Sequence, residues 1–579
     1  MRGARPRLYR SGRDRVGRTG SRAGVAHHPV PVTGTAEGPA ATVVTARKIR
    51  PDYRSGACFR HVVIANGVVK ALANTQEEAA RAAGPAACWV DLGSACAGPG
   101  FIDTHIHAIA AAADARLVSV REAATIAELL AAVREAALRR GPGEWTVSAR
   151  NWHESQLREG RLPTGGELDA LGVPGPVMLR RGSHLAVLNS RARAMLARGE
   201  AAGAGAGANG AAGLSEAPGA APVTSDALIA RALRLAGEPG PGARRDDLAT
   251  VLARFSARGI TSIREAGVDA GELELFHALR RDGRLPVRCD LLWRVPEGSD
   301  LGAARQRIQE MPAGDLADAY LRLTGVKVFV DGRIADAAIS GGAGPDHTGA
   351  EPFRMPPEDL WAIVAESLAR GTGAACHAVG DRAVRTVLEV YERALAAGLA
   401  ADPRQLTVEH ALNCTPETIR RLAASGVGVS THPGIVYEFA DEVRRYWGGE
   451  NSARAAPVRD MVSAGVQVAA GSDGDVPPFD PMRNIWFMVT RTGRTGGPIG
   501  PDQAVARSLA FDLYTRRGAA LLGVAERRGE LRPGMDADLA AFVTDPLSCP
   551  ATALPDTEVV LTLLAGRPVH DPAGLMAQA

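Results

Sequence analysis

The sequence predicts an α/β protein in which a (β/α)8 TIM-type barrel is joined to a small β-sandwich domain formed from both chain ends. Two observations predict this fold. Apolar runs typical of buried strands alternate with segments of helical periodicity, as in a barrel of parallel strands. Short β-branched runs also lie near both ends of the chain, outside the alternating region. The predicted barrel strands span residues 101–107, 260–264, 286–293, 323–330, 373–377, 406–410, 427–432 and 466–473.

The chain ends supply the strands of the predicted sandwich. The amino-terminal part has β-branched runs at 42–48, 61–66 and 67–73, with an Asn66-Gly67 hairpin-turn signal, and the carboxyl-terminal part has runs at 538–543 and 559–564. Neither half has enough apolar surface to fold alone, so we expect the two to pack together. The predicted organisation is an extension at 1–40, a sandwich at 41–97 plus 526–579, and a barrel at 98–525 with an insertion at about 143–245.

The first 40 residues have a different composition from the rest. Residues 1–22 contain eight arginines and a single acidic residue, Asp14. No apolar segment typical of a secretory signal is present. We interpret this part as a disordered extension or a misassigned start; a transit peptide or an anion-binding arm is the alternative. The arginines are Arg2, Arg5, Arg7, Arg10, Arg13, Arg15, Arg18 and Arg22.

The overall composition indicates which kinds of binding partner and which cellular compartment to expect. The 67 basic and 64 acidic residues nearly balance at a net charge of +3, which predicts a small-molecule substrate and no nucleic-acid partner. We expect no membrane span, and a homo-oligomer would be compatible with the sequence. The seven cysteines are odd in number and form no CxxC pair, which predicts free thiols in a reducing, cytoplasmic setting.

Histidines and one aspartate follow the predicted strands where the strands end. His105 and His107 lie two residues apart, so in a strand they point the same way and can bind one metal ion. All carboxyl ends of barrel strands meet at one face, so side chains from several strands are expected to converge there. Each alone is more often a buried core histidine or a helix cap than a ligand. The further candidates are His377, His410, His432 and Asp473.

Lysine is almost absent from the chain, which makes one lysine informative. Only Lys48, Lys70 and Lys327 occur, and Lys327 lies within the predicted strand 323–330. A buried primary amine can lose its proton and react with carbon dioxide to give a carbamate, which a guanidinium does not do. The alternative is a lysine that survived a codon bias and extends to the surface.

These residues suggest a two-metal centre. We expect His105, His107 and Asp473 on one zinc, His377 and His410 on a second, and Lys327 as a carbamate that bridges both. Two zinc ions per chain are the first choice, and iron, manganese or cobalt would also suit these ligands. Asp473 would take a proton from the attacking hydroxide and pass it to the leaving nitrogen.

As an ordered set, these motifs resemble the amidohydrolase superfamily, in the family-3 branch that includes N-substituted formamide deformylases. The resemblance implies a metal-dependent hydrolase acting on carbon–nitrogen bonds other than peptide bonds, such as those of an amide, formamide or cyclic amide. The matching segments are Pro99-Gly-Phe-Ile-Asp-Thr-His-Ile-His107, Val326-Lys-Val-Phe-Val-Asp-Gly332, His377-Ala-Val-Gly-Asp-Arg-Ala383, Val408-Glu-His-Ala411, Gly471-Ser-Asp473 and Arg181-Gly-Ser-His184.

Three further residues are candidates for contact with substrate. By resemblance His184 lies at the pocket wall, and Trp152 would give an apolar surface beside it. The alternative is that Trp152 is a core residue and His184 only braces the insertion. His432 would polarise the scissile carbonyl, or else lie behind the residues that do so.

Two other functions stay open. The first is a mononuclear deaminase of an amino-heterocycle on the same barrel; the usual deaminase pattern has a glutamate soon after His377, and Ala378-Val-Gly-Asp381 lacks it. The second is an inactive barrel used for binding or assembly. Every proposed ligand is present, which speaks against the second.

Overall fold

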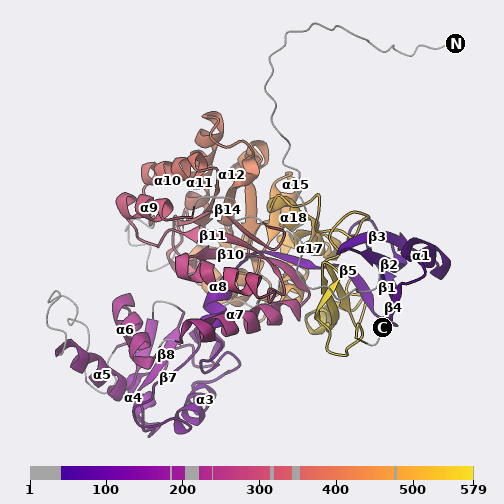
Figure 1. Cartoon of the computed structure of the whole chain (residues 1–579). Coiled ribbons are helices and arrows are strands. Elements are labelled where there is room, and N and C mark those ends of the chain that lie inside the picture. Colours follow the sequence, from indigo (N-terminus) through magenta and orange to yellow (C-terminus); the bar gives the residue numbers. More distant parts are fainter. Residues whose placement is uncertain are drawn as a thin grey trace. The chain divides into compact units, whose positions relative to one another are not determined.

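The computed structural model describes residues 41–182, 185–201, 221–237, 239–312, 318–341, 353–474 and 479–577. Within these residues, no helix is both long enough and apolar enough to cross a membrane. Figure 1 shows the arrangement of the elements.

The centre of the fold is a sheet of eight parallel strands in which each strand pairs with the next one along the chain. The first and last strands meet at their carboxyl ends, where Asp473 N donates to His105 O at 2.8 Å. The predicted barrel and its eight strands are therefore confirmed. The strands are β6 (Phe101–Ile106), β10 (Ile260–Val268), β11 (Arg288–Arg294), β12 (Leu321–Phe329), β13 (Gly373–Ala378), β14 (Leu406–His410), β15 (Gly428–Thr431) and β16 (Gln467–Ala470).

Helices follow the barrel strands and bury one face against them, as amphipathic helices do around a parallel sheet. In α11, for example, Val384, Leu388 and Tyr391 belong to the large core shared with the strands. The helices are α2 (Ala108–Asp114), α7 (Pro241–Ser256), α8 (Ala270–Arg281), α9 (Leu301–Gln309), α10 (Pro357–Ala369), α11 (Asp381–Ala396), α12 (Pro416–Ser425), α13 (Pro433–Glu438), α14 (Ala440–Ala453), α15 (Val458–Ser463), α16 (Pro481–Thr490), α17 (Arg507–Leu513) and α18 (Arg516–Leu521).

A second sheet combines strands from both chain ends, which confirms the predicted composite domain. Its strand order is β19-β18-β17-β5-β1-β2-β3, with β4 paired to β1. The predicted Asn66-Gly67 turn joins β2 to β3, and both residues have positive φ, at 53° and 78°. Val44 and Leu539 share one buried cluster. The elements are β1 (Thr42–Ile49), β2 (Phe59–Ala65), β3 (Val68–Ala73), α1 (Gln76–Ala83), β4 (Cys88–Asp91), β5 (Cys96–Pro99), β17 (Leu539–Phe542), β18 (Val559–Leu564) and β19 (Arg567–His570).

An insertion with its own cores separates α2 from α7. Its small sheet has the order β7-β8-β9. One core includes Val120, Leu129 and Val133, so residues that belong to this packing unit begin before residue 143. The division of the chain into domains stays a prediction. The elements are α3 (Ile126–Leu138), β7 (Thr146–Val147), α4 (Gly165–Asp169), β8 (Val177–Arg181), β9 (Leu185–Leu188), α5 (Ser190–Ala201) and α6 (Asp226–Ala236).

Candidate metal centre

Three of the predicted ligands meet where β6 and β16 end. His105 is the last but one residue of β6, His107 follows the strand, and Asp473 lies three residues beyond β16. Asp473 Oδ1 lies 3.2 Å from His105 Nε2 and 3.1 Å from His107 Nε2. Their ligand atoms lie within 4.8 Å of one another, close enough to bind one ion together. The structure thus brings together the three residues that we assigned to the first metal.

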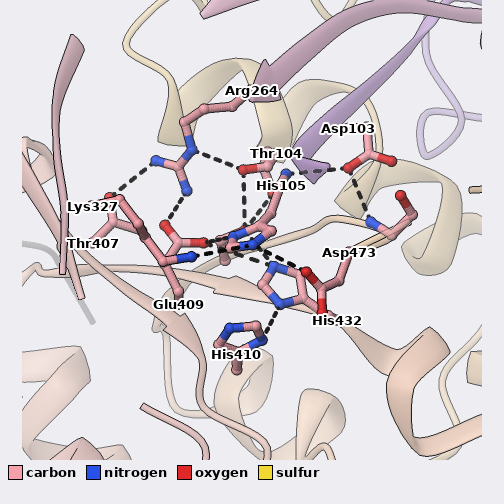
Figure 2. Close-up of polar contacts among 12 residues, drawn as sticks. Asp103, Thr104, His105, Arg264, Lys327, Thr407, Glu409, His410, His432 and Asp473 are labelled. Carbon is pink, nitrogen blue, oxygen red and sulfur yellow. Dashed lines mark hydrogen bonds and ion pairs between the residues drawn. The ribbon is translucent and has the colours of Figure 1, made fainter. Parts of the chain in front are cut away.

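A second group of three joins His105 to His410 and His432, also within 4.8 Å. His432 Nδ1 lies 2.7 Å from His410 Nδ1, and the His432 ring is completely buried (Figure 2). The sequence predicts His410 as a ligand and His432 as a residue that acts on substrate. The structure places His432 at ligand distance as well, so its distance alone does not separate the two roles.

His377 lies beside this second group. Its ring centroid is 4.2 Å from that of His410. Its Nε2 lies 3.0 Å from Gly332 O and 3.6 Å from Asp331 Oδ1. His377 is therefore a neighbour of the predicted second site, although it belongs to neither group whose ligand atoms lie within 4.8 Å.

Lys327 lies near the carboxyl end of β12 and is buried inside the barrel. Its side chain is 1% exposed, and Nζ lies 3.4 Å from His105 Nε2 and 5.1 Å from the centroid of the Phe329 ring. Burial lowers the pKa of this amine. A lower pKa shifts the amine toward the neutral form that carbamate formation requires.

The electrostatics of the centre favour neutral imidazoles at His377, His410 and His432 and an ionised carboxylate at Asp473. Burial lowers the pKa of His377 to about 3, and burial together with neighbouring histidines lowers the pKa of His410 and His432 well below the usual value. Burial alone would raise the pKa of Asp473, but contacts with His105 and His107 hold it well below its usual range. Neutral imidazole and carboxylate are the ligand forms that bind a metal.

Two charged residues of the centre were missed by the sequence analysis. Glu409 is completely buried between Arg264 and His105, and its Oε2 lies 2.5 Å from His105 Nδ1 (Figure 2). Burial alone would raise its pKa, but Arg264 and His105 hold the pKa of Glu409 at about 2. A signal was present in the sequence, because an acid directly before His410 in an apolar strand requires a partner. Regular alternation along a strand, however, predicts that Glu409 points away from His410.

The arrangement of donor atoms fits a bound cation. An ionised Glu409 can only accept a hydrogen bond, so His105 Nδ1 carries the ring proton and Nε2 keeps a lone pair. This lone pair faces Asp473 Oδ1, itself an acceptor, at 3.2 Å. In addition, His410 Nε2 is buried without a hydrogen-bond partner among the described residues. Metal ions bound at the two groups would satisfy these atoms, and imidazole with carboxylate suits zinc or a similar divalent ion.

Of the two predicted substrate contacts in the insertion, the structure describes Trp152 but not His184. Trp152 is 1% exposed, packs in the insertion core, and donates from Nε1 to Arg180 O. This placement favours the alternative that Trp152 is a core residue, and its role toward substrate stays a prediction. His184 lies outside the described residues.

Comparisons with known proteins agree with this geometry. The model described as "Amidohydrolase family" matches residues 89–570. N-substituted formamide deformylase of Arthrobacter pascens is 30% identical over 542 residues, which cover 90% of this chain and 97% of the relative. A 5-methylthioadenosine/S-adenosylhomocysteine deaminase of Desulforudis audaxviator is 28% identical over 34% of this chain and 45% of the relative.

A solved structure shows the same fold. An uncharacterized metal-dependent hydrolase from Pyrococcus horikoshii has a TM-score of 0.70 at 21% identity, with 88% of this chain and 99% of that chain covered. This chain thus has the same barrel fold as that hydrolase, with a histidine-rich centre at the ends of its strands. More particularly, this chain belongs to the amidohydrolase family and is a hydrolase of carbon–nitrogen bonds.

Proposed function

We propose that the protein hydrolyses a non-peptide carbon–nitrogen bond of an amide, formamide or cyclic amide, with N-substituted formamides as the first substrates to test. The observation that carries this proposal is the similarity to N-substituted formamide deformylase over 90% of the chain. Within that span, all six predicted metal ligands are present and lie around the carboxyl ends of the barrel strands. They are His105, His107, His377, His410, Lys327 and Asp473.

In this proposal the centre would hold two divalent metal ions, with zinc as the first choice. His105, His107 and Asp473 would hold one ion, His377 and His410 the other, and a carbamate on Lys327 would bridge them. When bound, the metals polarise the scissile carbonyl and make water nucleophilic at neutral pH. The buried amine of Lys327, 3.4 Å from His105 Nε2, supports the bridging role.

Asp473 would move the proton during the reaction. Its side chain keeps 17% exposure, whereas that of His105 has none, so Asp473 can reach both the centre and a bound substrate. Its low pKa makes it an acceptor at neutral pH, and protonation at a carboxylate oxygen would let it donate to the leaving nitrogen. His432 would donate a hydrogen bond to the carbonyl oxygen of the substrate.

The deaminase alternative has one observation in its favour, the similarity to a deaminase over about a third of the chain. Two observations weigh against it. The chain and that relative cover less than half of each other, and the segment Ala378-Val-Gly-Asp381 after His377 has no glutamate. We therefore keep hydrolysis of an amide or formamide as the proposal.

A panel assay tests the proposal. Purified protein loaded with zinc and bicarbonate is incubated with N-substituted formamides, other N-acyl amines, hydantoin-like rings and amino-heterocycles, and formate, amine and ammonia are measured. We expect amine and carboxylate from at least one amide or formamide, with activity lost in Asp473→Asn and kept in Asp545→Asn. Asp545 is a matched carboxylate that pairs with Lys48 and Arg50 outside the centre. Ammonia from an amino-heterocycle alone would favour the deaminase.

A further inference from the structure

Glu409 connects the metal centre to a buried arginine. One carboxylate oxygen, Oε2, accepts from His105 Nδ1 at 2.5 Å, and the other, Oε1, accepts from Arg264 Nη2. Arg264 also donates from Nε to Thr104 O at 2.8 Å, the carbonyl of the residue before His105. Arg264 therefore contacts both the strand that carries His105 and the acid that orients its ring (Figure 2).

Both members of this ion pair are buried. Arg264 is 4% exposed and Glu409 is completely buried. Removing two charges from water has a large free-energy cost, and an apolar pair of similar volume would often stabilise a core as well. A contribution to fold stability therefore explains this buried ion pair poorly. A role in orienting the His105 ring explains it better.

A cavity of about 240 Å³ reaches the same arginine from the opposite end of the strands. It is lined by Arg264 and by residues at or near the amino ends of strands, such as Thr324, Gly373 and Thr407, with Asp402 and Arg404 at its edge. The side chains of Asp402 and Arg404 are 40% and 46% exposed, so the edge is open to solvent. Arg264 is therefore within reach of a small solute that never enters the metal centre.

We propose that Arg264 and Glu409 are positioning residues that hold His105 in the form that binds metal. Arg264 holds the Glu409 side chain in place, and Glu409 accepts a hydrogen bond from His105 Nδ1, which leaves Nε2 free as a ligand. A partner of this kind typically changes metal affinity by about 10–100-fold. The proposal rests on the proposed function only in that His105 is a metal ligand.

Metal affinity of purified protein, measured by competition with a chelator, tests the pair without any substrate. Cobalt(II) serves as the probe because its visible spectrum also reports the ligand geometry. We expect Glu409→Gln and Arg264→Ala to bind cobalt about 10–100-fold more weakly than wild type and with an altered spectrum. Circular dichroism checks that each variant is folded, and Arg264→Lys replaces Arg264→Ala if the latter is not.

Rescue by a small solute separates positioning from general destabilisation. Removal of the Arg264 side chain opens the cavity into the pair, so millimolar guanidinium is expected to restore cobalt affinity in Arg264→Ala, and sodium chloride at equal ionic strength is not. Arg288→Ala is the matched control, since Arg288 forms a buried pair with Asp538 away from the centre. We expect its cobalt affinity to equal that of wild type with or without guanidinium.

The outcomes separate the two proposals. Wild-type affinity in both Glu409→Gln and the Arg264 variant would overturn the positioning role while leaving the proposed function intact. Equal loss of cobalt affinity in Arg288→Ala would also overturn it, because the effect would then be general destabilisation. Wild-type protein that binds no metal would overturn this proposal and the proposed function together.

Discussion

The backbone leaves its ordinary conformation at two candidate ligands. His410 has a φ of 74° and Asp473 a φ of 53°, both in the left-handed region that costs a non-glycine residue free energy. At His410 the positive φ ends the alternation of β14, which allows both Glu409 and His410 to face the centre. Such conformations persist when surrounding contacts hold them, and here they serve to aim side chains at one point.

The role of His432 can be assigned by mutation. Its Nε2 lies 3.1 Å from Ser430 Oγ, and its Nδ1 faces His410. If His432 polarises the carbonyl, His432→Asn should lower kcat by more than about tenfold, because a donor to the developing negative charge is lost. Metal per chain should stay at the wild-type value. Loss of metal in this variant would instead make His432 a ligand, as its place in the second group of histidines allows.

At the scale of elements, the predicted ligands come from strands far apart in the sequence. β6 contains His105, β12 Lys327, β13 His377 and β14 His410, and neighbouring strands of this sheet pair in parallel. Parallel pairing places all carboxyl ends at one face, which is why a sequence rule on strand ends found these residues.

The packing of Trp152 in the insertion can be tested by mutation. Trp152 fills its core and donates a hydrogen bond to Arg180 O. We expect Trp152→Ala to destabilise this unit by about 3–5 kcal/mol, because a large cavity replaces the indole. Hydrogen exchange should show faster exchange in β7, β8 and β9 than in the barrel strands, and Trp152→Phe should have a smaller effect. A raised KM with wild-type exchange rates would show that Trp152 contacts substrate instead.

Periodicity and strand-end chemistry predicted the barrel, the composite sheet and the six metal-ligand candidates. They could not predict Glu409 and Arg264, because pairing between β10 and β14 across the barrel interior is a matter of three-dimensional distance and leaves no local pattern. The role of Trp152 could not be decided from the sequence either, since an aromatic residue near a motif has the same sequence signal whether it lines a pocket or fills a core. Tertiary packing decides between the two.

At the scale of the whole molecule, the two chain ends support the barrel from outside. Arg288 at the start of β11 pairs with Asp538 at 2.8 Å and with Asp536 at 3.2 Å, just before β17. β17 in turn pairs with β5, which leads directly into β6 and the His105 strand. The composite sheet thus pairs directly with the segment that leads into β6.

The measurement that tests the central claim most directly is metal per chain by plasma mass spectrometry. Wild type and Lys327→Ala are prepared in parallel with zinc and bicarbonate. The account predicts about two metals in wild type and one or fewer in the variant, because the bridging carbamate is lost. About one metal in both would contradict the bridged pair and favour a mononuclear centre, and none in either would contradict a metal-dependent mechanism altogether.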